Sequence, residues 1–502
     1  MSVIRVAIVG GGSAGLSMAQ QLVHVAPERF APVIFESRER VGGLWCYDRA
    51  PGPCSVHVSD AQHTTGYASW DAAIPASAMY DGLYTNIPSD IMAYRDAPFS
   101  RQTPLFPQRA QVLDYLESFA REQDLLRYVR FKTHVERVAK CPTGWQVTSR
   151  AFSSGEVTEE HFDCVVAANG RCSIPNVPYI PGIANYKGLQ LHSAWYRYPD
   201  AFRGQTVLIV GNNSSGGDIA RELCGGVKRV FPGSDDWNAS GSASVTVYQV
   251  YRDPESPPPM DYDPRSPDSP AWCRRINVVG PITRITDDGR VETATGEVLS
   301  VDTIIWATGF LYSFPYLDHA VEPFATHPVV PLVGDEHTRV AADAHAASIP
   351  HNLDDWFLFY RHDNSLCFLG LPNRIVPFPF TQLQSRIAAH VWLGRIPALP
   401  GVRSSLGPDD PARWQLATHD SPKPLVDLTF GAESEHAYHD ALLALLPGEQ
   451  GKQRPPGQEA YIAKGDGRGG GDHAPEGWYQ LSQWRRDRRK AGRMLRREQI
   501  GY

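Results

Sequence analysis

The chain opens with the stretch Val6-Ala-Ile-Val9-Gly10-Gly-Gly12-Ser13-Ala14-Gly15, which decides the fold of its first segment. The apolar run predicts a strand that is buried on both faces of a parallel sheet. Apolar residues at helical spacing follow the glycines, and Val33-Ile-Phe-Glu36 predicts a second strand. Strand, glycine turn, helix and strand in this order predict a βαβ unit that binds a dinucleotide.

The glycine turn predicts where phosphates bind. Gly10 permits the tight turn, Gly12 lets the backbone approach a pyrophosphate, and Gly15 lets the helix pack closely on the strand. The helix start offers free N–H groups and the positive end of a dipole. Glu36 ends the second strand, where a carboxylate hydrogen-bonds an adenosine ribose and repels a 2′-phosphate. We therefore expect this unit to bind FAD or NAD rather than NADP.

The middle of the chain repeats the pattern. A strand over Thr206–Val210 leads into Gly211-Asn-Asn213-Ser214-Ser215-Gly216, and a helix is predicted from Asp218 to Leu223. Asn213 stands where the second glycine is expected, and we expect the turn to survive because asparagine tolerates left-handed backbone angles. Asp218 is expected in the first helical turn, where a carboxylate favours the helix dipole.

The second unit has no counterpart of the acidic residue that ends the second strand of the first unit. Its next predicted strand, Val245–Tyr251, is followed by Arg252. An arginine there can pair with a 2′-phosphate, which favours NADPH over NADH. A solvated surface arginine is the alternative. Lys228 and Arg229, which precede a Gly/Ser-rich insertion at 231–244, are other readers of the same phosphate.

A last buried strand, Val301–Trp306, leads to Ala307-Thr308-Gly309-Phe310. The rest of the chain is too irregular for a third nucleotide fold, so we expect it to return to the first domain. The predicted fold class is α/β with two Rossmann-like domains, the second inserted in the first. The expected domains are 1–178 with 323–502, and 179–322.

Composition excludes several functional classes. The 502 residues exceed the ~250–300 at which single cores stop growing, and the net charge of -7 gives no reason to expect nucleic acid. No long apolar run predicts membrane insertion, and no signal peptide is evident, so we expect a cytoplasmic protein. The eight cysteines show neither a CxxC pair nor zinc spacing, which predicts free thiols and no metal site.

An ordered series of further motifs identifies a family. The sequence resembles the flavin-containing monooxygenases (class B flavoprotein monooxygenases), particularly the fungal-type members, from Ile4 to about Pro400. The motifs that carry the resemblance are Tyr186-Lys-Gly188-Leu-Gln-Leu-His192-Ser-Ala-Trp-Tyr196, similar to FxGxxxHxxx(Y/F); Tyr80-Asp-Gly-Leu-Tyr-Thr85-Asn86-Ile-Pro88, similar to LxTNxP; Ala307–Phe310, similar to ATG(Y/F); and the later segments Phe368–Gly370 and Phe378–Gln384.

The resemblance implies FAD in the first domain, NADPH in the inserted domain, and O2 as co-substrate. NADPH would reduce FAD, and a C4a-hydroperoxyflavin would pass one oxygen atom to a soft nucleophile, an amine or a sulfide. Asn86 would be the catalytic residue beside flavin and nicotinamide, and His192 would help coordinate domain motion. Further cofactor contacts implied by the resemblance are Gly43, Leu44, Trp45, Thr85, Thr308, Gly309 and Gln384.

A purely structural role is the alternative for several of these residues. Asn86 could be only a turn residue, Trp45 only core packing, and His192 an ordinary surface or hydrogen-bonded histidine. The aromatic residues of 356–360 could line a pocket, although core packing is the safer interpretation.

Other functions compete with a flavin-containing monooxygenase. A Baeyer–Villiger monooxygenase would have Trp, then Pro or Asp, where this chain has Tyr196 and Arg197. A disulfide reductase would carry the missing CxxC, and a silent nucleotide-binding protein is suggested by the altered second turn. The fungal-type resemblance suggests natural-product biosynthesis. The oligomeric state stays open, a homodimer included.

A basic helix near 484–497 is expected to dock on the acidic remainder of the protein, with membrane-surface contact as the alternative.

Overall fold

The computed structural model describes residues 2–59, 66–70, 74–226, 245–258, 262–330, 332–333, 340–341, 350–397, 399, 428–448 and 476–501. The expectations for Lys228, Arg229 and the 231–244 insertion lie outside these residues.

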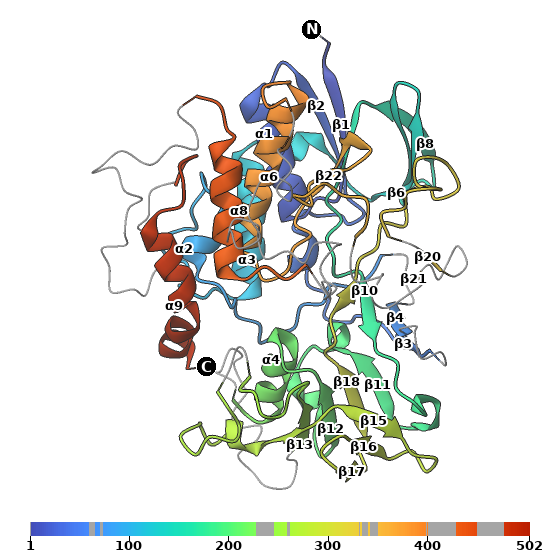
Figure 1. The fold of residues 1–502 in the computed structure, drawn as a ribbon, viewed down its shortest axis with the longest axis vertical. Coiled ribbons are helices and arrows are strands. Elements are labelled where there is room, and N and C mark those ends of the chain that lie inside the picture. Colours follow the sequence, from blue (N-terminus) through green and yellow to red (C-terminus); the bar gives the residue numbers. More distant parts are fainter. Residues whose placement is uncertain are drawn as a thin grey trace.

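The first sheet joins distant parts of the chain (Figure 1). Its described strands run in the order β22-β23-β9-β1-β2-β5, and all neighbours are parallel except β22 and β23. The strands are β1 (Ile4–Val9), β2 (Phe30–Phe35), β5 (Val129–Arg130), β9 (Cys164–Ala167), β22 (Phe359–Tyr360) and β23 (Asp363–Phe368). Strands from both ends of the chain therefore complete one sheet.

The second sheet is wholly parallel in its described strands, in the order β11-β18-β12-β13-β14. Its strands are β11 (Leu189–His192), β12 (Thr206–Val210), β13 (Thr246–Val250), β14 (Ile276–Val279) and β18 (Thr303–Trp306), and its helix is α4 (Ser214–Leu223). The expected α/β fold with two Rossmann-like units is confirmed. The domain limits at 178/179 and 322/323 stay predictions.

The chain passes between the two sheets through a pair of strands. β10 (Ile174–Val177) leads toward the second sheet and pairs antiparallel with β19 (Phe310–Leu311), which follows its last strand. β10 also pairs with β4 (Gly66–Trp70), which pairs with β3 (Cys54–His57). The chain therefore enters and leaves the second unit through two neighbouring strands. The other described strands are β6 (Thr133–Cys141), β7 (Gly144–Ala151), β8 (Val157–Phe162), β15 (Ile282–Ile285), β16 (Val291–Thr293), β17 (Val298–Leu299), β20 (Leu332–Val333) and β21 (Val340–Ala341).

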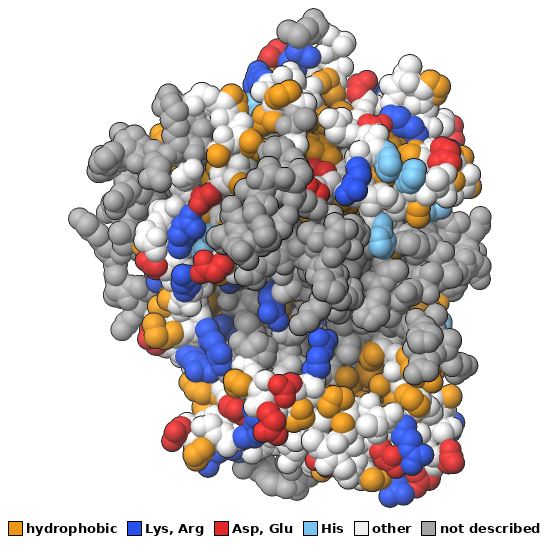
Figure 2. Space-filling model, viewed as in Figure 1, with side chains coloured by type: hydrophobic (Ala, Val, Ile, Leu, Met, Phe, Trp, Pro, Cys, Tyr) orange, Lys and Arg blue, Asp and Glu red, His pale blue; other side chains and the backbone are white. Residues whose placement is uncertain are grey.

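The expected basic helix is α9 (Gln483–Ile500). It runs beside α2 (Ser89–Met92) and α8 (Ala432–Ala444) and ends near α4 (Figure 1). Figure 2 shows Lys and Arg side chains, with acidic ones among them, on the same side of the molecule. The ion pairs of α9 include Arg486–Asp440, Arg488–Asp90, Arg489–Glu435 and Lys490–Glu433. Docking on acidic side chains is confirmed.

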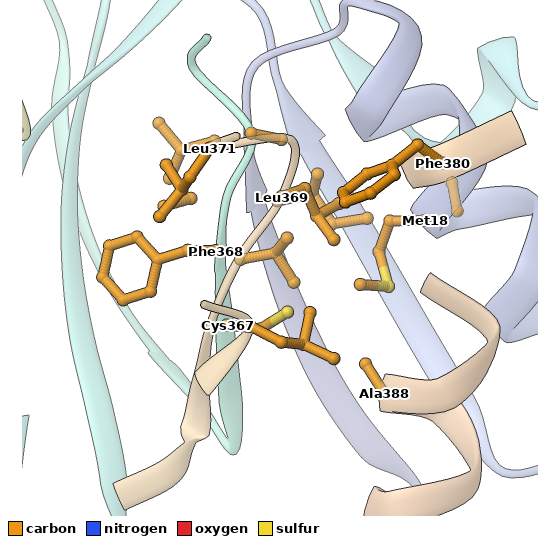
Figure 3. Packing of buried hydrophobic residues seen from close by; sticks show 14 of the residues in the cluster. Met18, Cys367, Phe368, Leu369, Leu371, Phe380 and Ala388 are labelled. Atoms are coloured by element: carbon orange, nitrogen blue, oxygen red, sulfur yellow. The ribbon is translucent and has the colours of Figure 1, made fainter. Parts of the chain in front are cut away.

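The main core lies between the first sheet and its helices. α1 (Ser13–Val25) packs against α6 (Pro377–Trp392), and α3 (Arg109–Glu122) adds Val112, Leu116 and Phe119. Figure 3 shows Met18 and Phe380 close to the residues that end β23 and follow it. The aromatic residues Trp356, Phe357, Phe359 and Tyr360 are all buried in this core, which confirms the safer interpretation of that segment.

The second unit requires two corrections. α4 begins at Ser214, so Asp218 lies in the second turn and not in the first. Asp218 is instead buried beside cationic side chains, which stabilise its charge more directly than the helix dipole would. Asn213 has φ −78° and ψ −169°, which closely match the φ of −77° and ψ of −171° at Gly12. The turn therefore survives because this position needs no left-handed angle.

No helix within the described residues is both long and apolar enough to cross a membrane.

Gly216 and Gly217 are neighbours in α4 and offer a matched test of the strand–helix contact. A side chain at Gly216 would overlap with the Gly211 carbonyl, whereas one at Gly217 would meet no atom within 4 Å. We expect Gly216→Ala to lower the free energy of unfolding by about 3 kcal/mol, because the helix must shift. Gly217→Ala should raise it by about 1 kcal/mol through helix propensity. Urea titrations followed by circular dichroism measure both, and equal effects would contradict this account.

Candidate functional site

In the first glycine turn, the fold requires glycine at positions 10 and 15 but not at position 12. Gly10 has φ +108°, and a Cβ there would lie 2.6 Å from the Ala168 carbonyl oxygen. A Cβ on Gly15 would overlap with the Gly10 carbonyl. Gly12 has an ordinary negative φ, and its Cβ would meet only Gly43, with 3.4 Å between the added Cβ and Gly43 Cα. The bare backbone at Gly12 therefore fits a ligand that must come close.

The start of α1 is open to such a ligand. Gly12 is the N-cap residue and makes no side-chain cap hydrogen bond, and Ser13 and Ala14 are only partly buried. Uncapped N–H groups at a helix start favour an anion. These residues therefore fit the pyrophosphate of a dinucleotide.

Glu36 follows β2 and is folded back onto the turn. Its carboxylate accepts hydrogen bonds from the backbone N–H of Gly11 at 2.7 Å and of Arg38 at 2.8 Å. Burial raises the pKa of Glu36, although both hydrogen bonds favour its charged form. A cavity of about 610 Å³ opens beyond Ser37, with Lys132 in its wall. The ribose contact of Glu36 stays a prediction.

The segment Gly43–Trp45 forms a short 3-10 helix against the same turn. Gly43 has φ +54°, and a Cβ there would lie 2.9 Å from Gly12 Cα. Leu44 is 39% exposed and therefore free to contact a ligand. Trp45 is half-buried and packs edge-on to Phe378, with 6.4 Å between ring centroids. Direct flavin contacts of this segment stay predictions.

The second glycine turn reproduces the first. Gly211 has φ +114°, and a Cβ there would lie 2.5 Å from the Ala307 carbonyl oxygen. Asn213, Ser214 and Ser215 are exposed at the start of α4, which has no side-chain cap. Both helices therefore present uncapped N-termini at the carboxyl ends of their sheets, the usual ligand edge of such folds.

Asn86 joins the two units. Its side-chain amide donates a hydrogen bond to the Ser214 hydroxyl at 3.3 Å, across 128 residues of sequence. Thr85 is buried, and its hydroxyl donates to the Ile87 carbonyl at 2.9 Å. Asn86 is exposed beside the open start of α4. It is therefore more than a local turn residue.

The motif Tyr186–Tyr196, called the linker motif below, is buried at both of its ends. His192 ends β11 with no exposed surface, so the surface alternative is wrong. Its Nδ1 accepts a hydrogen bond from the Ala194 N–H at 3.2 Å, and burial lowers the pKa of His192 to about 3. The Tyr186 hydroxyl donates to the Val301 carbonyl at 3.1 Å, and a side chain on Gly188 would overlap with the Tyr186 hydroxyl. His192 is thus a neutral residue that shapes the linker.

The residues of the later motifs have protein partners. The Thr308 hydroxyl donates to the Asn176 carbonyl at 2.5 Å, and the Gly309 carbonyl accepts from the Asn176 N–H at 2.9 Å. Gln384 is fully buried. Its carbonyl accepts from the Gly370 N–H at 2.9 Å, and its amide donates to the Tyr438 hydroxyl at 2.7 Å. Their cofactor contacts stay predictions.

Arg252 lies two residues after the end of β13 and is exposed. It is therefore free to approach a ligand at the carboxyl edge of the second sheet.

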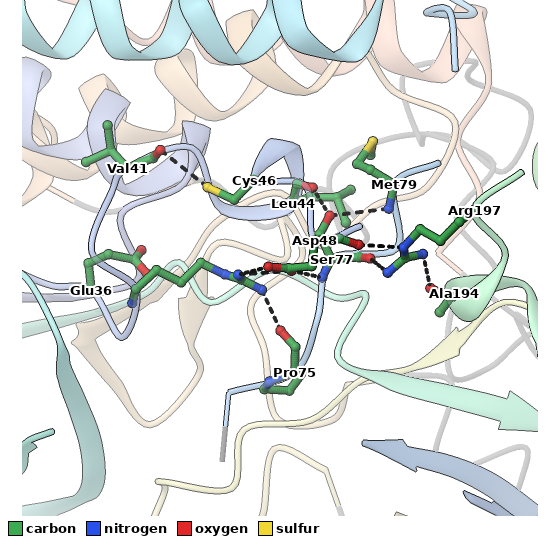
Figure 4. A network of polar contacts seen from close by, with 11 residues as sticks. Glu36, Val41, Leu44, Cys46, Asp48, Pro75, Ser77, Met79, Ala194 and Arg197 are labelled. Carbon is green, nitrogen blue, oxygen red and sulfur yellow. Dashed lines mark hydrogen bonds and ion pairs between the residues drawn. The ribbon is translucent and has the colours of Figure 1, made fainter. Parts of the chain in front are cut away.

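Sequence reasoning missed a polar network around Arg197 (Figure 4). Its buried guanidinium donates to four backbone carbonyls, those of Asp48 at 2.6 Å, Ser77 at 2.7 Å, and Ala194 and Tyr196 at 2.8 Å each. Arg197 thus ties the linker to loops of the first unit. Its place directly after the linker motif is the one sequence signal for this role.

Asp48 extends the same network. Its carboxylate pairs with Arg38 at 3.1 Å and accepts from the Ser77 N–H at 2.8 Å. The backbone N–H of Arg38 in turn donates a hydrogen bond to the Glu36 carboxylate. The network therefore reaches from the linker to the carboxylate at the first turn.

The described residues include no group of three or more His, Cys, Asp or Glu that could hold a metal ion. All eight cysteines are free.

Comparisons with known proteins agree on one family. A family profile described as FMO-like, flavin-binding monooxygenase-like, matches residues 3–240. Flavin-containing monooxygenase FMO GS-OX5 of Arabidopsis thaliana is 32% identical over 412 residues, which are 78% of this chain and 74% of the relative. Flavin-containing monooxygenase FMO GS-OX-like 7 of the same plant is 30% identical over 458 residues, 87% of this chain and 83% of the relative.

Among solved structures, S-allyl-L-cysteine S-oxygenase from Allium sativum has a TM-score of 0.70 and 26% identity, with coverage of 99% of this chain and 93% of that chain. These relatives are plant proteins, so the fungal-type subdivision stays a prediction.

Gly12→Ala separates ligand binding from folding. We expect the flavin-free variant to keep the melting temperature of the flavin-free wild type, because its added methyl meets only ordinary contact with Gly43. We expect its flavin affinity to fall by at least about tenfold, the effect of ~1.4 kcal/mol of lost contact. The ratio of flavin absorbance to protein after purification measures this, with Gly217→Ala as a control. Full flavin content in Gly12→Ala would refute the assignment of the first turn.

Proposed function

The chain belongs to the flavin-containing monooxygenase family, and on that premise we propose that it is an FAD- and NADPH-dependent S-oxygenase of a small thioether. Its class as a flavin-dependent monooxygenase follows from the family. The single observation that carries the two-cofactor part of this proposal is the hydrogen bond from Asn86 to Ser214, 3.3 Å long. It brings a side chain from the flavin side to the helix start that would hold the nicotinamide nucleotide.

The proposed FAD site is the first turn. Gly10, Gly12 and Gly15 with the start of α1 would hold the pyrophosphate, and Glu36 would hold the ribose. The buried carboxylate supports FAD over NADPH here, because a 2′-phosphate would add a second negative charge beside it.

The proposed NADPH site is the second turn. The uncapped start of α4 would hold the pyrophosphate through Asn213, Ser214 and Ser215. The exposed Arg252 would pair with the 2′-phosphate. The shared backbone geometry of Asn213 and Gly12 argues against a silent second site.

The reaction balances with these partners. One thioether, O2, NADPH and a proton give one sulfoxide, water and NADP+. Bound FAD would accept hydride and activate O2, which is chemistry that a cofactor supplies and amino acids do not. The chain's own residues bind and orient the partners and exclude water. Asn86 would act as the catalytic amide, through hydrogen bonds at the junction of the two units.

Sulfur is proposed as the acceptor atom because a structural relative over almost the full chain carries the name S-allyl-L-cysteine S-oxygenase. An amine would suit the same chemistry, as would a ketone in the Baeyer–Villiger reaction. These are therefore the alternative outcomes of the test.

The test uses purified holoenzyme with NADPH, 18O2 and three probes, S-allyl-L-cysteine, a tertiary amine and cyclohexanone. We expect the sulfide to gain one 18O atom, with one NADPH oxidised per sulfoxide. We expect Asn86→Ala to keep NADPH oxidation and to release about tenfold more peroxide, since catalytic groups depend on close alignment. Oxygenation of only the amine or the ketone would replace the thioether proposal. Peroxide alone from the wild type would overturn it.

Arg252 is tested by comparing the two nicotinamide cofactors. Arg252→Ala should raise the KM for NADPH by roughly tenfold to 100-fold, because charge-assisted hydrogen bonds contribute about 1.5–3 kcal/mol. The KM for NADH should hardly change. Arg284→Ala is the control, since Arg284 lies in the same unit but pairs with Glu292 at 2.6 Å. Equal effects on both cofactors would remove Arg252 as the phosphate reader.

A further inference from the structure

Helix α4 carries a polar stripe of Ser214, Asp218 and Glu222, spaced four residues apart and therefore on one face. The segment 80–90, which carries Asn86, lies along this stripe. Ser214 accepts a hydrogen bond from Asn86, and Asp218 accepts one from the Tyr80 hydroxyl. Two successive turns of α4 therefore contact the segment, one at Asn86 and one at Tyr80.

The third residue of the stripe closes the same contact. Glu222 is buried and accepts a hydrogen bond from the Tyr196 hydroxyl at 2.6 Å. A side chain on Gly82 would overlap with the Glu222 carboxylate, so the backbone at Gly82 lies directly on it. Burial raises the pKa of Glu222 to about 7, which keeps a second negative charge away from Asp218 below that pH.

The charge of Asp218 depends on two arginines. The side chain is 11% exposed, and its carboxylate lies 2.7 Å from an Arg221 nitrogen and 3.4 Å from an Arg496 nitrogen. Burial opposes the charge, but the two guanidinium groups and the Tyr80 hydroxyl outweigh it and hold the pKa of Asp218 below its usual value. Arg496 is itself only 4% exposed and comes from α9.

Helix α9 also packs on this segment. Gly492 is buried against Pro88, and a Cβ on Gly492 would lie 3.6 Å from Pro88 Cδ. One turn earlier, Arg488 pairs with the buried Asp90 at 2.6 Å. The segment that carries Asn86 therefore contacts both α4 and α9.

The far end of α9 lies on the second unit. Arg493 donates to the Pro258 carbonyl at 3.4 Å, and the Arg497 guanidinium lies 4.2 Å from the centre of the Tyr262 ring. Both partners follow β13 in the chain. One helix therefore contacts the Asn86 segment and the nicotinamide-nucleotide unit together.

We propose that the Arg496–Asp218 ion pair positions Asn86 for oxygen transfer, which makes α9 a part of the oxygenation machinery. This inference rests on the proposed function of Asn86. Arg496 is a positioning residue, since it acts through Asp218 and Tyr80 and does not itself meet Asn86. If α9 served only to attach the end of the chain to the protein, surface ion pairs would be enough. Instead, α9 places the buried guanidinium of Arg496 at the junction of the two units.

The test compares variants of the holoenzyme in two measurements. Arg496→Gln removes the charge, Arg496→Lys keeps it, and Tyr80→Phe removes one hydroxyl. Arg486→Gln is the matched control, because Arg486 lies on the same helix but pairs with Asp440. The measurements are peroxide released per NADPH oxidised, and hydrogen exchange of the peptide 80–93, whose protected amides include Asp81 and Thr85.

We expect Arg496→Gln to raise peroxide release by about tenfold, since small displacements of an aligned group cost rate steeply. It should also speed exchange of 80–93, and Arg496→Lys should partly restore both values. Arg486→Gln should match the wild type. Tyr80→Phe combined with Arg496→Gln should add little to either single change, because both act through Asp218.

Three outcomes separate the inference from its premise. If Arg496→Gln folds with full flavin content and both measurements equal the wild type, the inference is wrong. If it fails to fold, the gentler Tyr80→Phe decides on the same two measurements. If the wild type oxygenates no probe, the proposed function fails, while unchanged exchange in the variants would independently overturn the positioning role.

Discussion

The structure depends on one close contact that is made twice. In each nucleotide-type unit, a glycine one turn into the helix lies on the carbonyl of the glycine that ends the strand, at Gly15 with Gly10 and at Gly216 with Gly211. A side chain would push the helix off its strand, and the helix start would leave the sheet edge. Both uncapped helix starts, and the hydrogen bond from Asn86 to Ser214 at the second of them, require this approach.

Local patterns in the sequence predicted most of the fold, because buried strands and glycine turns are set by near neighbours. β12 has the bounds expected of it, and β1 begins two residues earlier than its apolar core. The start of α4 was misjudged because its first residues, Ser214 to Gly216, read as a turn by composition. The backbone at Asn213 follows the fold and not the residue's own preference for left-handed angles.

The site was predicted less completely, since its contacts cross long stretches of sequence. The motif residues Asn86 and His192 were found because each stands inside a recognisable run. Asp218 was found but given the wrong partner, since its true neighbours Tyr80 and Arg496 lie 138 and 278 residues away. Arg197 shows the same limit, because the hydrogen bonds of its guanidinium go to backbone carbonyls, which every residue type carries.

The interrupted first sheet has a consequence for the newborn chain. β9 lies between β1 and β23, and β23 begins at Asp363, after every described strand of the second sheet. As the ribosome extrudes the polypeptide from its N-terminus, the later unit receives all its described strands while the earlier one still has an open edge beside β9. An exposed edge invites pairing with other chains. The first unit, whose N-terminal strands are synthesised first, is therefore the last of the two to complete its sheet.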